Sequence, residues 1–220
     1  MVWQPFNQNS SIHFFQDKCR VVLVLGAGAS AHLGYPLGAA LCDQIILNAE
    51  NSESKRFKDF LAMGFEEKKI VSFNENLQRS LSRSIDEFLG DRPEYTDVGR
   101  AAIAQVLIGC EREKSLLERQ NNWYSLLRDR IKSDIDRNTY PPIIVTFNYD
   151  LSLDQSIYNS LSSTVEQFRT MKTLADALQI FHVHGRLGFL DFETEQPVRR
   201  IYGKSNSPDE YCRSAKVFGL

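Results

Sequence analysis

Three apolar runs rich in β-branched residues divide the chain, and each is followed at once by glycine or polar residues. The runs cover residues 21–25, 143–147 and 180–183. The first run shows no alternation of apolar and polar positions, which is typical of a parallel strand buried on both faces. Because segments with helical spacing separate the runs, the pattern predicts an α/β fold in which the three runs are adjacent parallel strands.

The apolar residues between these runs recur at helical spacing and predict several helices. The predicted helices are a short one ending near Lys18 and those over residues 37–50, 54–63, 75–89, 96–114 and 123–135. Thr96 and Asp97 are suitable starting caps for the helix over 96–114. We interpret residues 1–20 as an N-terminal extension and about 50–135 as a helical insertion after the first strand–helix unit. From Asp191 onward the pattern is irregular and predicts no strong strand.

Composition places the chain among ordinary globular proteins and argues against several classes of partner. It has 220 residues, of which 42% are hydrophobic and 25% charged, enough for one sizeable core. The net charge of −2 has interleaved signs, so we expect no direct nucleic-acid partner. No apolar run is long enough to cross a bilayer, and the first residues do not resemble a signal peptide. We therefore expect a cytoplasmic protein without a membrane partner.

Metal-ligand patterns are weak in this sequence. The four cysteines are widely scattered, with no C-x-x-C pair: Cys19, Cys42, Cys110 and Cys212. This spacing argues against a zinc ribbon and against a dense disulfide framework. His182 and His184 form an H-x-H pair, but no third ligand stands at a fixed spacing from them. We expect no metal.

The glycine-rich segment after the first strand, GAGAS at residues 26–30, is a candidate nucleotide site. Glycines let the backbone approach a pyrophosphate, and amide groups at a helix start favour its negative charge. A tight strand-to-helix turn would also favour glycine, so the segment alone leaves both interpretations open. The segment GAGASA also satisfies the dinucleotide fingerprint of dehydrogenases, and Glu50, 22 residues beyond Gly28, is a candidate ribose-binding acid.

The residues after this fingerprint count against a dehydrogenase. The helix that follows a dinucleotide fingerprint runs unbroken for about three turns, whereas Gly34 and Pro36 interrupt the pattern here. A proline inside a helix costs about 3 kcal/mol. We therefore predict a short turn, a loop and then a new helix starting near Leu37. A loop in this place could fold over the nicotinamide end of a bound dinucleotide.

The second and third strands also end in residues that can do chemistry. In open α/β sheets, ligands bind beyond the carboxyl ends of the strands. Asn148 and Asp150 project from the same side if the strand period holds, and asparagine offers both a donor and an acceptor. By the same rule His182 and His184 share a face, and Gly185 permits a sharp exit. A histidine there could act as a base on ribose, although strand-end histidines and helix-capping Asn and Asp are commonly structural.

These three strand ends, in this order, resemble the motifs of the sirtuin-like NAD-binding family. The matching segments are GAGASAHLGYP (26–36), TFNYD (146–150) and HVHG (182–185). SIDEFL (84–89) and PDEY (208–211) are similar to segments of the bacterial branch that degrades NAD in anti-phage defence. The resemblance extends over nearly the whole of residues 21–220. It implies a Rossmann-like parallel sheet flanked by helices, and an NAD hydrolase that releases nicotinamide and ADP-ribose.

The resemblance also implies roles for individual residues. Those that would hold the pyrophosphate are Gly26, Ala27, Gly28 and Ser30. Those that would border the nicotinamide are Tyr35 and Pro36. Asn148 would orient the ribose and the attacking water, and Asp150 would contact the nicotinamide amide or support Asn148. His184, followed by Gly185 of the HG motif, would bond a ribose hydroxyl and act as the base.

Two departures from the family pattern shape the expected function. The four-cysteine zinc module and the D-F-R continuation of the protein-deacylating sirtuins are missing, which favours hydrolysis of NAD. No counterpart of the later strand that helps bind the adenosine half stands before Leu220, so we expect the domain to be incomplete at its C-terminus. Besides the hydrolase, two alternatives stay open: a non-catalytic sensor of NAD or ADP-ribose, and a dehydrogenase. A homo-oligomer or a partner defence subunit is the expected protein partner.

Overall fold

The computed structural model describes residues 20–50, 52–118, 122–164, 178–193, 199–204 and 207–216. The helix predicted to end near Lys18 lies outside these ranges. Strands β1 (Val22–Leu25), β2 (Ile143–Thr146) and β3 (Ile180–His182) form a parallel sheet in the order β1-β2-β3. The prediction of a mixed α/β fold with these three runs as parallel neighbours is therefore confirmed.

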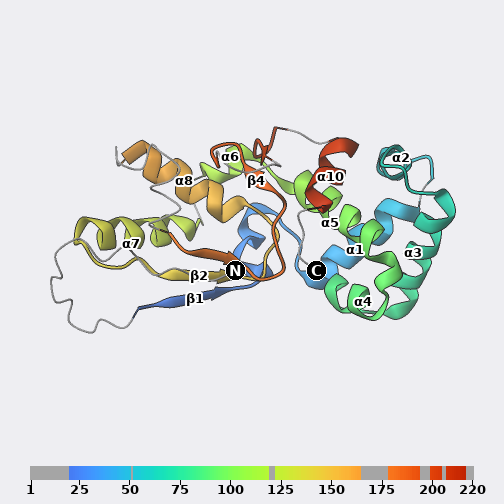
Figure 1. The fold of residues 1–220 in the computed structure, drawn as a ribbon, viewed down its shortest axis with the longest axis horizontal. Helices are drawn as coiled ribbons and strands as arrows, with labels where there is room; N and C mark the ends of the chain where they lie inside the picture. The colour runs from blue at the N-terminus through green and yellow to red at the C-terminus, as the bar shows by residue number, and fades with distance from the viewer. Residues whose placement is uncertain are drawn as a thin grey trace, which may run out of the picture.

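The prediction that β1 is buried on both faces is wrong. Val22 and Val24 are 53% and 66% exposed, whereas Leu23 and Leu25 pack against the core. Helices α7 (Tyr124–Asp136) and α8 (Ser152–Thr164) lie on the same side of the sheet (Figure 1). Because the strands follow each other in chain order across the sheet, right-handed connections place the connecting helices on one face. Among the described residues, no helix covers the face that carries Val24.

The part of the chain that connects β1 to β2 is mostly helical. The 3₁₀ turns η1 (Ala27–Ala29) and η2 (Ala31–Leu33) come first, and the helices are α1 (Gly38–Glu50), α2 (Lys55–Ala62), α3 (Glu67–Ser80), α4 (Ile85–Asp91), α5 (Thr96–Cys110), α6 (Glu113–Leu116) and α7. The helices α1 to α5 gather beyond the carboxyl ends of the strands (Figure 1). The sheet and this helical insertion therefore face each other across the strand ends, where ligands bind in α/β proteins.

Two predicted helices differ from the observed ones. The helix predicted over 75–89 is divided, because Leu81 adopts a left-handed conformation (φ 52°) after α3 and the Ser84 hydroxyl caps a new helix, α4. The helix predicted over 96–114 ends at Cys110, and α6 follows it. A short 3₁₀ turn, η3 (Pro93–Tyr95), leads into α5, so Thr96 is its first residue and not its cap.

Two short strands and a helix lie close to or beyond Asp191, where the sequence pattern predicts no strong strand. Strands β4 (Phe189–Leu190) and β5 (Arg199–Arg200) pair in parallel, and α10 (Pro208–Ala215) packs against α5. A buried ion cluster holds this arrangement: Arg200 donates to Glu111, with 2.7 Å between Nη2 and Oε2, and to Glu210, with 2.9 Å between Nε and Oε1. The residues of this cluster lie far apart in sequence, so the local pattern gives no sign of it. Within the described ranges, no helix is both long and apolar enough to span a bilayer.

Candidate functional site

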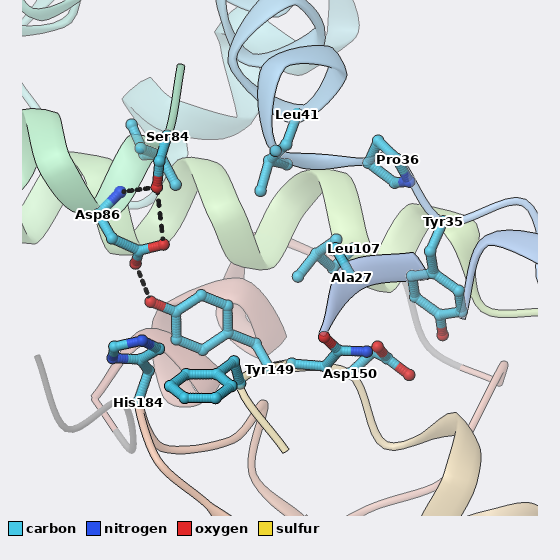
Figure 2. Close-up of a pocket in the computed structure, with 14 residues that line it drawn as sticks. Ala27, Tyr35, Pro36, Leu41, Ser84, Asp86, Leu107, Tyr149, Asp150 and His184 are labelled. Atoms are coloured by element: carbon cyan, nitrogen blue, oxygen red, sulfur yellow. Dashed lines mark hydrogen bonds between the residues drawn. The ribbon is translucent and has the colours of Figure 1, made fainter. Parts of the chain in front are cut away.

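A cavity of about 210 Å³ lies between the ends of the sheet strands and the helical insertion. Predicted site residues that line it are Ala27, Tyr35, Pro36, Asn148, Asp150 and His184 (Figure 2). The insertion adds polar and apolar side chains from α1, α4 and α5, which include Asp86 and Leu107. Gly26, Gly28 and Gly185 are not among the lining residues but lie next to one in the chain. Ser30 does not line the cavity either. The structure thus brings residues from all three predicted strand ends around one cavity.

The glycine loop turns without a regular helix behind it. The N–H of Ala29 bonds the carbonyl of Gly26 at 2.9 Å, and two 3₁₀ turns follow before Gly34, whose φ of +88° requires glycine. Helix α1 then begins at Gly38. The predicted break at Gly34 and Pro36 is therefore confirmed.

Gly26 and Gly28 have free space around them. A Cβ added to either residue would meet no protein atom within 4 Å. Gly26 has an extended backbone that any residue can adopt (φ −112°). Packing against the described protein therefore does not explain why residue 26 or residue 28 is glycine, and both positions leave the backbone open to close approach by a ligand.

The start of α7 braces the glycine loop from behind. The indole N–H of Trp123 donates to the carbonyl oxygen of Ala29 at 2.8 Å. The hydroxyls of Tyr124 and Ser30 are 3.2 Å apart, and Ser30 is only 2% exposed. Ser30 therefore lies behind the cavity wall, where its hydroxyl cannot reach a ligand in the cavity directly.

Ser30 connects Asp150 with Asn148. Its hydroxyl donates to Oδ2 of Asp150 at 2.8 Å and accepts a hydrogen bond from Nδ2 of Asn148 at 3.1 Å. The backbone N–H of Ser152 also donates to Asp150, at 3.1 Å. Burial raises the pKa of the Asp150 carboxyl, and the hydrogen bonds from Ser152 and Ser30 oppose this shift. Asp150 thus supports Asn148 through Ser30.

The direction of these bonds fixes the amide of Asn148. Ser30 has one hydroxyl proton, which it gives to Asp150, so its oxygen can only accept from the amide of Asn148. The NH₂ group of Asn148 must therefore face Ser30. The amide oxygen Oδ1 makes no hydrogen bond within the described part of the chain and is available as an acceptor on a residue that lines the cavity.

His184 lies at the cavity with both ring nitrogens available. Its ring centroid is 5.5 Å from that of Phe147 and 6.1 Å from that of Tyr149. No hydrogen bond to its ring is found among the described residues. Gly185 follows with a φ of +84°, which turns the chain away directly after the histidine.

His182 has a structural role and faces different surroundings from His184. Strand β3 ends at His182, so the strand period on which the predicted common face rests does not extend to His184. The buried ring of His182 lies 2.8 Å from the carbonyl oxygen of Asn148 through Nδ1 and 3.2 Å from Oδ2 of Asp154 through Nε2. Burial disfavours the charged ring, but the Asp154 carboxylate prevails and raises the pKa of His182. His182 thereby holds the backbone of Asn148 against α8.

Sequence reasoning missed the residues that the insertion brings to the cavity. The hydroxyl of Tyr149 donates to Oδ1 of Asp86, in the first turn of α4 (Figure 2). Burial and the Asp86 bond raise the pKa of the Tyr149 hydroxyl, against the opposing charge of Arg100. Tyr149 stands between Asn148 and Asp150 in TFNYD, and Asp86 belongs to SIDEFL, but neither segment indicates that these two side chains meet.

The alternative dinucleotide site of a dehydrogenase lacks its geometry. Glu50 is the last residue of α1, and the strand paired with β1 is β2, which begins at Ile143. A ribose-binding acid belongs at the end of a strand beside the first one. The described residues contain no group of three or more His, Cys, Asp or Glu side chains arranged to hold a metal ion.

Comparisons with known proteins leave the family open. No protein-family model matches the chain, and neither the curated proteins nor the solved structures include a significant match.

Proposed function

We propose that this chain binds NAD and hydrolyses the bond between nicotinamide and ribose, giving nicotinamide and ADP-ribose. One observation carries the proposal: Asn148 and His184, which follow two adjacent parallel strands, line one cavity beside the glycine loop. Ligands of α/β proteins bind at this end of the sheet. On the same ground we interpret the sheet and its glycine turn as a Rossmann-like domain.

The open glycine loop supports binding of a phosphate-bearing ligand. The space around Gly26 and Gly28 leaves their backbone accessible, and such amide groups can approach a pyrophosphate. Ligand pockets commonly measure about 300–1,000 Å³, so a cavity of about 210 Å³ suits one half of a dinucleotide. We assign the nicotinamide ribose to the cavity and the pyrophosphate to the glycine loop at its edge.

Asn148 is suited to position the attacking water. Its NH₂ group is held by Ser30, so the amide oxygen can accept a hydrogen bond from a water or a ribose hydroxyl. Groups that are fixed before the reaction lose little freedom at the transition state, which lowers the barrier. The backbone contact with His182 fixes the same residue from the other side.

His184 is suited to receive the proton. In the proposed reaction the C–N bond to nicotinamide breaks, and nicotinamide leaves with the bonding electron pair. The ribose carbon passes through an oxocarbenium-like state and forms a bond to the water oxygen. The water proton then passes to the imidazole of His184, whose nitrogens have no partner among the described residues.

Incubation of the purified protein with NAD tests the proposal. We expect nicotinamide and ADP-ribose in equal amounts, measured by chromatography. Appearance of the reduced cofactor on addition of an alcohol or hydroxy acid would instead identify a dehydrogenase. Binding of NAD without any turnover would identify a sensor.

The biological setting of the proposal comes from the sequence alone. A role in anti-phage defence, with a second copy of the chain or another defence subunit as partner, follows from the resemblance of the motifs. We also propose a cytoplasmic location, as the sequence analysis leads us to expect.

A further inference from the structure

The helical insertion contributes a carboxylate to the wall of the cavity. Asp86 is held at both oxygens: Tyr149 donates to Oδ1, and the Ser84 hydroxyl donates to Oδ2 at 3.1 Å. The N–H of Asp86 also bonds the Ser84 hydroxyl oxygen at 3.1 Å. Figure 2 shows Asp86, the Tyr149 hydroxyl and the His184 ring at the same end of the cavity. The carboxylate is therefore fixed in place in the wall of the same cavity as His184, the residue that we assign as the base.

The charged side chains that line the cavity have one sign, and the positive charge of Arg100, which acts on the Tyr149 hydroxyl, is not among the lining residues. Two carboxylates line it, Asp86 and Asp150, and none of the described residues that line it is a lysine or an arginine. Oδ2 of Asp150 accepts a hydrogen bond from Ser30, and Oδ1 accepts one from Ser152. Neither serine lines the cavity. Three aromatic residues, Tyr35, Phe147 and Tyr149, also line the cavity. Carboxylates and aromatic rings both attract a cation.

We propose that Asp86 is the counter-charge for a cationic pyridinium ring and makes the cavity select oxidised NAD over its reduced form. This inference rests on the proposed function. The nicotinamide ring of NAD carries a positive charge, whereas the ring of NADH is neutral and of similar shape. As the C–N bond breaks, this positive charge moves from the ring to the ribose, and the nicotinamide leaves neutral. Asp86 therefore favours both the bound substrate and the reacting state over the neutral nicotinamide that leaves.

Asp86→Asn tests this assignment with little change of shape. The asparagine oxygen can still accept from Tyr149, so the contact between α4 and the sheet is kept. We expect affinity for NAD to fall about tenfold, the size of a partly screened charge pair, with affinity for NADH unchanged. The matched control is Glu87→Gln, because Glu87 is an exposed carboxylate in the same turn of α4 and does not line the cavity. The control should leave both affinities at the wild-type values.

A small-molecule probe separates this inference from the proposed reaction. Calorimetry compares nicotinamide methylated on its ring nitrogen, a cation, with neutral nicotinamide. We expect wild type to bind the cation more tightly and Asp86→Asn to lose that preference, whether or not nicotinamide is released from NAD. Equal binding of the two compounds by wild type, or an unchanged preference in Asp86→Asn, would overturn the inference. A preserved cation preference without release of nicotinamide would contradict the proposed hydrolysis alone.

Discussion

Replacing Ser30 with alanine removes the hydroxyl that joins Asp150 to Asn148. Ser30 is 2% exposed, and its hydroxyl donates to Asp150 at 2.8 Å. A hydrogen bond to a charged group contributes about 1.5–3 kcal/mol. Asp150 keeps its bonds from Ser152, so we expect a loss at the lower end, about 1–2 kcal/mol in the free energy of unfolding.

The same change releases the amide of Asn148. Without the Ser30 oxygen, the NH₂ group has no fixed partner and the amide can rotate. Loss of one preorganised donor at a reacting group costs about 10²–10³ in rate. Because Ser30 acts through Asn148 and not on the substrate, we expect a smaller decrease in nicotinamide release, roughly tenfold to a hundredfold.

Urea unfolding and nicotinamide release, measured on the same samples, separate the two effects. Ser214→Ala is the matched control, since Ser214 is 1% exposed and its hydroxyl has no partner among the described residues. Because it removes no hydrogen bond among the described residues, it should not lower the free energy of unfolding and should leave the rate unchanged. The double variant with Asn148→Ala should be no slower than Asn148→Ala alone. A wild-type rate in Ser30→Ala, or additive losses in the double variant, would refute the connection.

Two further predictions concern buried charges. Arg200→Leu leaves two buried carboxylates without their partner and should lower the free energy of unfolding by about 3–5 kcal/mol, measured with urea; a loss below about 1 kcal/mol would contradict the buried ion cluster. His182→Gln tests a pH effect: Asp154 raises the pKa of His182 above 6.5, so the charged ring stabilises the fold fully below that pH and loses its effect as pH rises through the folded-state pKa. The stability difference between wild type and His182→Gln should therefore shrink as the pH rises above 6.5, and a difference that grows would refute the pairing with Asp154.

Local patterns in the sequence were sufficient to predict the three strands and the break in the helix after the glycine loop. β-branched runs specify strands through the packing of neighbouring side chains, and Gly34 and Pro36 interrupt a helix through backbone conformation alone. The division of the helix predicted over 75–89 depends on Leu81, a residue that rarely adopts a positive φ, so its sequence carries no sign of the turn. The exposure of Val24 depends on strand order, which the sequence pattern does not contain.

The candidate site was predictable only at the strand ends. Because parallel strands present their carboxyl ends at one edge of the sheet, the residues that follow them are expected to lie at one site. This rule predicted the positions of Asn148, Asp150 and His184. The contact between Tyr149 and Asp86 joins residues 63 positions apart. The hydrogen bond between the hydroxyls of Ser30 and Tyr124 joins residues 94 positions apart. Such contacts arise from the packing of the insertion on the sheet, and no periodicity within either segment predicts them.

The most direct test of the account is the rate of nicotinamide release from NAD by wild type and by Asn148→Ala. The matched control is Asn159→Ala, since Asn159 lies on α8, bonds Gln155 and does not line the cavity. Removal of the group that orients water and ribose should slow release by about 10²–10³, or about 3–4 kcal/mol, while the circular dichroism spectrum stays that of wild type. Asn159→Ala should keep the wild-type rate. Release by a folded Asn148→Ala at the wild-type rate would contradict the central claim.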